Sequence, residues 1–128
     1  MTTVVAAVIE REGRILIAQR KRTGQHPLKW EFPGGKVEPG EEPEAAVVRE
    51  LEEELAIRAR VDHEIMHYEY QYPERPPILL IFYRVTEFAG EPQNLDFEQI
   101  AWVERGSLGD HDFLEGDADF IRVFKTAP

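Results

Sequence analysis

The feature that most restricts how this chain can fold is the segment 43–55, PEAAVVRELEEEL, whose apolar residues recur at helical spacing. Pro43 suits the first turn of a helix, where its missing N–H costs nothing. The apolar side chains on one face of this helix are Val47, Val48, Leu51 and Leu55. Because such a stripe must be covered, residues 43–55 are predicted to form a helix that packs on a sheet.

The rest of the sequence supplies the strands of that sheet. Apolar, β-branched runs at 2–10 and 14–20 are joined by the turn-forming REG, which predicts a hairpin. Further strands are predicted at 30–32, 59–72, 77–88 and 99–103, a loop before Trp30, a sharp turn at 33–35, and a closing helix at 117–126. With 128 residues the chain is too short for two ordinary domains, so residues 1–128 are expected to form a single α/β domain with a mixed sheet and two helices.

The charge is concentrated around the predicted helix. The chain carries a net charge of −10, and residues 35–57 hold eight acids against Lys36 and Arg49, a local charge of −6. Binding of duplex nucleic acid requires a basic patch, so that class of partner is excluded. Free nucleotides are repelled as well, unless a cation intervenes. The alternative is an acidic, solvated helix that only promotes solubility.

The absence of cysteine and the absence of a membrane-spanning segment narrow the class of protein further. The chain has no cysteine, which excludes a disulfide scaffold and thiolate metal sites and fits a reducing compartment. No apolar run approaches the roughly 20 residues of a membrane span, and the N-terminus does not resemble a signal peptide. A cytoplasmic protein that does not enter the membrane is expected.

Three glutamates gather on the helix beside the apolar stripe. Glu50, Glu53 and Glu54 are related by steps of three and four residues, so they share a face, whereas Glu52 points away. Such neighbours repel by roughly 0.2–0.5 kcal/mol per pair. A hard divalent cation offsets this cost, and Mg²⁺ typically binds through one or two carboxylates plus substrate phosphates. The sequence therefore predicts that the three carboxylates converge on a cation.

A rival metal motif is HEIMH at 63–67, which matches the H-E-x-x-H zinc signature. That signature needs a helix to bring both histidines together. Here the alternation of Tyr68, Tyr70 and Tyr72 continues from it and favours a strand, and no third ligand is evident. A structural role for these histidines is the preferred interpretation.

Residues 35–57, GKVEPGEEPEAAVVRELEEELAI, resemble the Nudix box at every fixed position except Ala56, where the family usually has Gly. The resemblance extends to WEFPGGKVEPGE and HDFLEGDADFI, which look like segments of the MutT-type nucleoside triphosphate pyrophosphohydrolases. It implies an α/β/α sandwich with a central mixed β-sheet. Ala56 would occupy a left-handed turn, at a cost on the order of 1 kcal/mol.

The family resemblance also implies an activity. MutT-like members hydrolyse a nucleoside triphosphate, such as 8-oxo-dGTP or another modified or normal (d)NTP, to a nucleoside monophosphate and pyrophosphate with Mg²⁺ or Mn²⁺. Dinucleoside polyphosphates, nucleotide sugars and a weakly catalytic nucleotide-binding module are the alternatives, and a purely structural domain is a third class. The expected partner is a small nucleotide, with no duplex nucleic acid and no membrane, and the protein is expected to be a monomer or a homodimer.

The resemblance assigns roles to the residues of the box. It implies that Glu50 and Glu54 are metal ligands, that Glu53 is a ligand or the general base, and that the Gly34 carbonyl is a further ligand. Arg49 orients the glutamates through salt bridges, the alternative being an ordinary helix ion pair.

Further residues are candidates for substrate binding: Arg20, Glu31, Phe32, Lys36, Tyr72 and Asp117. Arg20 and Lys36 are suited to phosphate. Phe32 and Tyr72 would flank the base unless they belong to the core. Alternation along a strand would let only one of Glu31 and Phe32 face the pocket. Asp117 lies where MutT-type proteins carry an Asn or Asp that hydrogen-bonds the base edge, so the resemblance implies that role; the alternative is a cap of the last helix.

One more carboxylate is a weaker candidate. Glu98 directly precedes the predicted strand 99–103. It is considered as an additional carboxylate near the metal.

Overall fold

The sheet is organised by its long first strand. In the computed structural model, which describes residues 1–127, β1 (Thr2–Arg11) pairs in parallel with β7 (Ile78–Val85) along one edge. Its other edge is shared: Val4–Ala6 pair antiparallel with β4 (Gly34–Lys36), and Glu10 and Arg11 pair antiparallel with β2 (Arg14–Gln19). The mixed sheet predicted from the sequence is thus present.

The remaining strands extend the sheet on both sides. β6 (His63–Tyr70) pairs with β7, and β2 pairs with both β3 (Trp30–Glu31) and β9 (Gln99–Glu104), which gives seven strands in all. A separate two-stranded sheet is formed by β5 (Arg58–Arg60) and β8 (Glu87–Ala89). Two short 3₁₀ helices, η1 (Arg105–Asp110) and η2 (Glu115–Asp117), precede the last α-helix.

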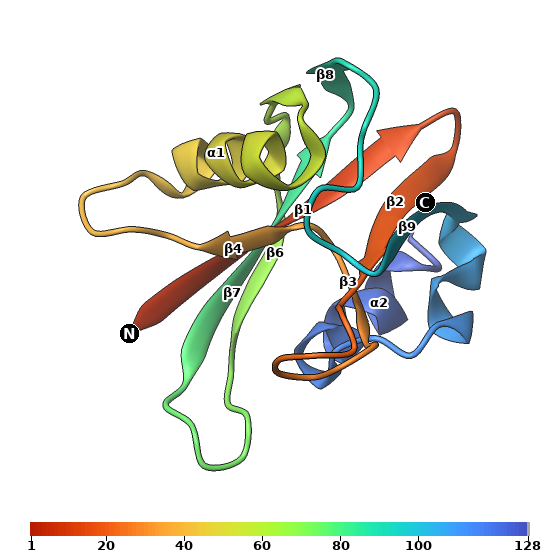
Figure 1. The fold of residues 1–128 in the computed structure, drawn as a ribbon. Coiled ribbons are helices and arrows are strands. Elements are labelled where there is room, and N and C mark those ends of the chain that lie inside the picture. The colour runs from red at the N-terminus through yellow and green to blue at the C-terminus, as the bar shows by residue number, and fades with distance from the viewer. Residues whose placement is uncertain (128) are drawn as a thin grey trace.

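Two helices cover the sheet. Helix α1 (Pro43–Leu55) lies on one side of it and α2 (Ala118–Phe124) on the other (Figure 1). Alternate residues of β1 enter the two resulting cores: Val5, Ala7 and Ile9 pack on the α1 side, and Ala6 and Val8 pack on the α2 side. This period-two alternation makes β1 the shared wall between the layers. None of the helices described over residues 1–127 is long and apolar enough to cross a membrane.

Helix α1 has the predicted bounds, with one correction to its apolar stripe. Val47, Leu51 and Leu55 are fully buried as expected, but Val48 is 36% exposed. Ala46 is buried in its place. The buried face of α1 therefore consists of Ala46, Val47, Leu51 and Leu55.

Three other predictions about local structure were wrong in part. Of the sharp turn predicted at 33–35, only Pro33 is a bend, and Gly34 and Gly35 belong to strand β4, in which glycine is required because a Cβ at Gly34 would clash with the carbonyl oxygen of Val5. The predicted strand 59–72 is two strands, and Tyr72 lies beyond the end of β6. The predicted strand 77–88 is likewise two strands, β7 and β8. Pro128, the last residue of the expected domain, lies outside the described residues.

Candidate active site

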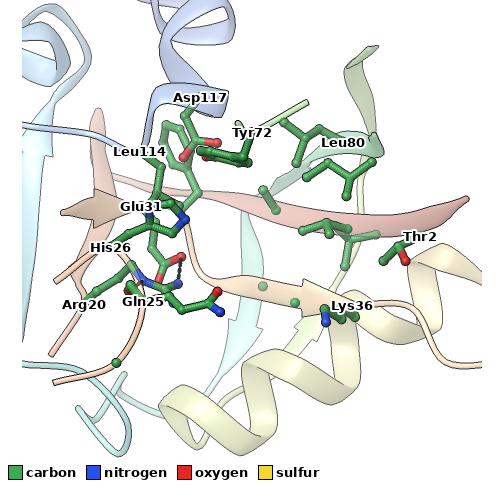
Figure 2. Close-up of a pocket in the computed structure, with 18 of the residues that line it drawn as sticks. Thr2, Arg20, Gln25, His26, Glu31, Lys36, Tyr72, Leu80, Leu114 and Asp117 are labelled. Carbon is green, nitrogen blue, oxygen red and sulfur yellow. Dashed lines mark hydrogen bonds and ion pairs between the residues drawn. The ribbon is translucent and has the colours of Figure 1, made fainter. Parts of the chain in front are cut away.

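A cavity of about 680 Å³ opens beside β4, large enough for a nucleotide (Figure 2). Its walls come from β4, the loop between β2 and β3, the loop between β6 and β7, and η2. Six predicted substrate residues line it: Arg20, Glu31, Phe32, Lys36, Tyr72 and Asp117. Arg20, Glu31, Tyr72 and Asp117 gather at one end and Lys36 lies at the other. The structure therefore brings together residues from four separate segments.

A pair of carboxylates from α1 lies against β4. The backbone N–H of Gly34 donates to Glu54 Oε1 at 3.1 Å. The Glu50 carboxylate packs so closely on Gly35 that an added Cβ would lie 2.6 Å from Glu50 Cδ. Glycine at 35, which lines the cavity, thus lets the Glu50 carboxylate pack directly on a residue of the cavity wall, and Glu54 itself lines the cavity.

The electrostatics of this pair show strong crowding of negative charge. Burial, followed by the charges of Glu50 and Glu31, raises the pKa of Glu54 to about 9. Burial also raises the pKa of Glu50, against the opposing effect of Arg49. Oxygen donors from two crowded carboxylates are the ligand type that a hard cation such as Mg²⁺ prefers, so the residues fit such an ion.

Glu53 is the exposed member of the three predicted carboxylates, and its role as metal ligand or general base stays a prediction. Its side chain is 59% exposed and lies 3.5 Å from Arg49 Nη1, the nitrogen that also contacts Glu50 Oε1 at 2.8 Å. Over residues 1–127, no group of three or more His, Asp or Glu side chains is arranged to hold a metal ion. Helical spacing placed Glu53 on the same side of α1 as Glu50, and the Arg49 guanidinium contacts both carboxylates.

The backbone of β4 offers a further oxygen. Pro33 O accepts a hydrogen bond from Ala7 N, and Val37 N donates to Thr3 O, so odd-numbered residues face β1. The N–H and carbonyl of Gly34 therefore point away from β1, on the side where Glu54 accepts its N–H. This orientation is compatible with the role predicted for the Gly34 carbonyl.

Arg49 ties the helix to the preceding loop. Its guanidinium donates to both carboxylate oxygens of Glu41, at 2.8 and 3.0 Å, to Glu50 Oε1 at 2.8 Å and to the Lys36 carbonyl at 3.1 Å. The hydrogen bond from Arg49 lowers the pKa of Glu41 to about 2. This set of contacts is more than an ordinary helix ion pair, because it fixes Glu50 relative to β4.

Arg20 and Glu31 form a half-buried ion pair in the cavity, with Arg20 Nη1 3.0 Å from Glu31 Oε1 (Figure 2). Burial raises the pKa of Glu31, and Arg20 opposes that rise. The expectation that only one of Glu31 and Phe32 faces the cavity was wrong, since both line it. Phe32 lies beyond the end of β3, so strand alternation does not apply to it. Its ring is 3% exposed and also packs in the core against Phe82.

Asp117 lines the far end of the cavity with a side chain that is 5% exposed. Burial, with a smaller contribution from the charge of Glu31, raises its pKa to about 8. Its side chain makes no capping hydrogen bond to α2, so the helix-cap alternative was wrong. A neutral carboxyl group there can donate as well as accept a hydrogen bond.

Tyrosines from β6 and the following loop hold Asp117 in place. Tyr68 donates its hydroxyl hydrogen to Gly116 O at 2.6 Å, and Tyr72 Oη accepts from Gly116 N at 2.9 Å. Burial raises the pKa of Tyr72 to about 12, so its hydroxyl stays protonated. Both bonds meet at the residue directly before Asp117.

Glu98 is not part of this arrangement. Its carboxylate lies 3.0 Å from Arg22 Nη2, and it is absent from the lining of the cavity. Asp96 lines the cavity instead and contributes to the charge that raises the pKa of Glu54 and Glu31. No local pattern singles out Asp96, because it lies in an irregular loop between β8 and β9.

The zinc alternative is contradicted. Residues 63–67 lie in β6, not in a helix, and Glu64 Oε2 lies 2.8 Å from His67 Nδ1. His63 and His67 are both exposed. The motif match therefore arises from a polar strand surface.

A mixed sheet between two helices, with a carboxylate pair on one helix beside a nucleotide-sized cavity, is the arrangement of an α/β enzyme with a candidate cation site. The model of the NUDIX domain family matches residues 1–124. The chain therefore belongs to the Nudix family and is a Nudix hydrolase, as the resemblance of residues 35–57 predicted.

Named relatives cover almost the whole chain. The CTP pyrophosphohydrolase of Escherichia coli strain K12 is 36% identical over 124 residues, which are 97% of this chain and 91% of the relative. The 8-oxo-dGTP diphosphatase of Haemophilus influenzae is 38% identical over 119 residues, 92% of this chain and 87% of the relative. A crystal structure of the MutT NUDIX hydrolase from Burkholderia pseudomallei superimposes with a TM-score of 0.81 at 26% identity, covering 94% of this chain and 95% of that one. This structural neighbour confirms the predicted fold class.

Proposed function

We propose that this protein is a Mg²⁺-dependent hydrolase that converts a nucleoside triphosphate and water into a nucleoside monophosphate and pyrophosphate. The observation that carries the proposal is the carboxylate pair of Glu50 and Glu54 against β4: Glu54 lines a cavity that also presents Arg20 and the buried Asp117, and Glu50 packs on Gly35 of its wall. The similarity to a CTP pyrophosphohydrolase and to an 8-oxo-dGTP diphosphatase supports it.

The residues of α1 and β4 have the chemistry this reaction needs. Glu50, Glu54 and the Gly34 carbonyl would hold the cation. Mg²⁺ bound there, or Mn²⁺ in its place, neutralises phosphate charge and makes a water molecule nucleophilic. Glu53, exposed beside Arg49, is suited to accept the proton of the attacking water as general base. That water adds its oxygen to a phosphorus atom, the bond to the bridging oxygen breaks, and pyrophosphate leaves.

The other lining residues bind the substrate. Arg20 and Lys36 are placed to contact phosphate oxygens, and Glu31 holds Arg20 in position through their ion pair. Phe32 and Tyr72 would contact the base from the cavity wall.

Asp117 would hydrogen-bond the edge of the base. A carboxyl group that is neutral at physiological pH suits a base that presents a ring nitrogen acceptor beside an amino group, as cytosine does. The ionised form suits a base with two neighbouring donors. A cytoplasmic location accompanies this proposal, because nucleotide pools are its substrate.

The test is an incubation with Mg²⁺ of the standard (d)NTPs, 8-oxo-dGTP, 5-methyl-dCTP, ADP-ribose and a diadenosine polyphosphate, with products resolved by chromatography. Formation of monophosphate and pyrophosphate from a triphosphate is expected, with strong loss in Glu53→Gln. The matched control is Glu52→Gln, because Glu52 is an exposed glutamate on the same helix that, unlike Glu53, is not among the ion-pair partners of Arg49. Cleavage of only ADP-ribose or the dinucleotide would favour the alternative substrates, and no cleavage at all would refute the hydrolase proposal for this panel.

A further inference from the structure

His26 and Tyr72 form an aromatic pair at the edge of the cavity. Their ring centroids are 4.8 Å apart with the planes tilted by 43°, and both residues line the cavity. They come from two loops: His26 from the one between β2 and β3, and Tyr72 from the one between β6 and β7. Figure 2 shows them on the same side of the cavity as Leu114 and Asp117. The pair therefore joins two loops beside the carboxyl group proposed to bind the base.

The backbone of the first loop is arranged to present the His26 ring. His26 has a φ of 52°, in the left-handed region that non-glycine residues adopt rarely. Its carbonyl accepts from Lys29 N at 3.3 Å, and the loop closes through Arg20 N donating to Lys29 O and Leu28 N donating to Arg20 O. Arg20 Nε also donates to Gln25 O. An unusual backbone conformation held by several hydrogen bonds around an exposed ring is typical of a functional loop.

Tyr72 is fixed from the opposite side. Its hydroxyl accepts from Gly116 N at 2.9 Å, and an added Cβ at Gly116 would lie 2.8 Å from that hydroxyl oxygen. The ring of Tyr70 packs edge-on against it, with centroids 4.8 Å apart. The position of Tyr72 is thus set by η2, and Tyr72 in turn supports His26.

The surroundings of His26 disfavour the charged form of its ring. Burial lowers the pKa of His26, the charges of Arg20, Arg75 and Lys29 act in the same direction, and Glu115 opposes them. A neutral imidazole presents an aromatic face suited to stacking on another ring.

We propose that the rings of His26 and Tyr72 form one wall of the base subsite and that His26 is a specificity-determining residue, against which the nucleobase packs. This inference rests on the proposed function, since it concerns the base of the nucleotide. His26 contributes to binding of ligands that carry a base and has no role toward pyrophosphate. A merely structural residue of the loop would affect both kinds of ligand.

The test separates these roles by the ligand used. His26→Ala, His26→Phe and the control His63→Ala are compared with the unmodified protein, since His63 is exposed on β6 and does not line the cavity. Binding of CMP, of GMP and of pyrophosphate is measured by calorimetry at fixed Mg²⁺, and kcat and KM are measured for the triphosphate that is cleaved best.

We expect His26→Ala to weaken binding of the better of the two monophosphates about 3- to 10-fold. Its KM should rise by a similar factor at nearly constant kcat, with pyrophosphate binding unchanged. His26→Phe should restore most of the loss, because it retains an aromatic face, and His63→Ala should match the unmodified protein.

Two results would overturn the inference while leaving the proposed function intact. One is equal binding of the monophosphate by His26→Ala and the unmodified protein. The other is a parallel loss of monophosphate and pyrophosphate binding, which would indicate a structural role for the loop. If the unmodified protein neither cleaves a triphosphate nor binds a monophosphate, the proposed function fails and this inference fails with it.

Discussion

The hydroxyl group of Tyr68 lies 2.6 Å from the carbonyl oxygen of Gly116, the residue that precedes Asp117. The same hydroxyl accepts a hydrogen bond from Phe120 N at 3.2 Å. One side chain on β6 thus satisfies a backbone acceptor before the last helix and a backbone donor inside it. Tyr68 is therefore a positioning residue for Asp117.

Replacing Tyr68 by phenylalanine should lower the free energy of unfolding by about 1–2 kcal/mol, because it leaves a part-buried carbonyl and a part-buried N–H without their partner. Urea unfolding measures the change. Tyr70→Phe is the matched control, since the hydroxyl of Tyr70 makes no hydrogen bond within residues 1–127. Equal stability of the two variants would contradict the positioning role.

The raised pKa of Asp117, about 8 against an ordinary value of 3.8, makes stability depend on pH. Between these values the native state keeps a proton that the unfolded state has released, so stability falls as pH rises from about 4 to about 8. The slope is at most about 1.4 kcal/mol per pH unit for one group.

Asp117→Asn removes this titration. The variant should gain stability relative to the unmodified protein as pH rises from 5 to 8, in urea unfolding at a series of pH values. Titration of other groups cancels in the difference between the two proteins. Parallel stability curves would show that Asp117 is already ionised at neutral pH.

Ala56 ends helix α1 in the left-handed conformation, with φ 57° and ψ 34°, and its N–H donates to Glu52 O. Glycine adopts this conformation without the steric penalty of a Cβ, although it also has more freedom in the unfolded chain. Ala56→Gly should therefore stabilise the protein by about 0.5–1 kcal/mol. Ala45→Gly, at an exposed position inside α1, should destabilise it by a similar amount. Thermal unfolding of both variants measures the two changes, and the melting temperature should rise for Ala56→Gly and fall for Ala45→Gly.

The left-handed turn at Ala56 is one feature that the sequence predicted well, because a single residue in a long motif implied its conformation. The bounds of α1 were predicted as well, since Pro43 and a regular apolar period define a helix locally. Strand β4 was missed for the opposite reason. Adjacent glycines are typical of turns, so the sequence predicted a turn here. In the structure glycine is required because Val5 and Glu50 pack closely against these positions, and such contacts between distant segments cannot be inferred from local sequence.

In the candidate site, too, residues with a local sequence pattern were predicted and residues placed by tertiary packing were missed. Residues of the motif and of WEF were found because each has a local pattern. Asp96 and His26 were missed, and Glu98 was chosen in place of Asp96. These residues lie in or beside loops, whose position relative to the cavity depends on tertiary packing and is not indicated by a helical or strand periodicity in the sequence.

Arg49 should not be replaceable by lysine. Its planar guanidinium contacts Glu41, Glu50 and the Lys36 carbonyl at once, whereas an ammonium group cannot reproduce this set of directions. Arg49→Lys should release Glu50 and lower kcat about 10- to 100-fold, with a smaller change in KM. Arg58→Lys is the control, because Arg58 is exposed on β5 and does not line the cavity. Unchanged kcat in Arg49→Lys would mean that charge alone suffices.

Binding of Mg²⁺ should be detectable without any nucleotide, because Glu50 and Glu54 already lie together against β4. A ligand that binds only the native state stabilises it by about 2.7 kcal/mol at 100 times its Kd, so the melting temperature should rise with added Mg²⁺ or Mn²⁺ and return on chelation. Glu50→Gln and Glu54→Gln should each lose most of this rise, because each removes a charged ligand from the pair.

Glu52→Gln separates this specific effect from simple charge screening. Glu52 is exposed on the same helix and carries the same charge, so general screening of the acidic surface by Mg²⁺ would respond equally to its loss. We expect Glu52→Gln to retain the full rise in melting temperature, and Glu53→Gln to retain most of it because the Glu53 side chain is 59% exposed, whereas that of Glu50 is 15% exposed. If all four variants show the same reduced rise, the cation acts through the net charge of α1, and the assignment of Glu50 and Glu54 as its ligands is wrong.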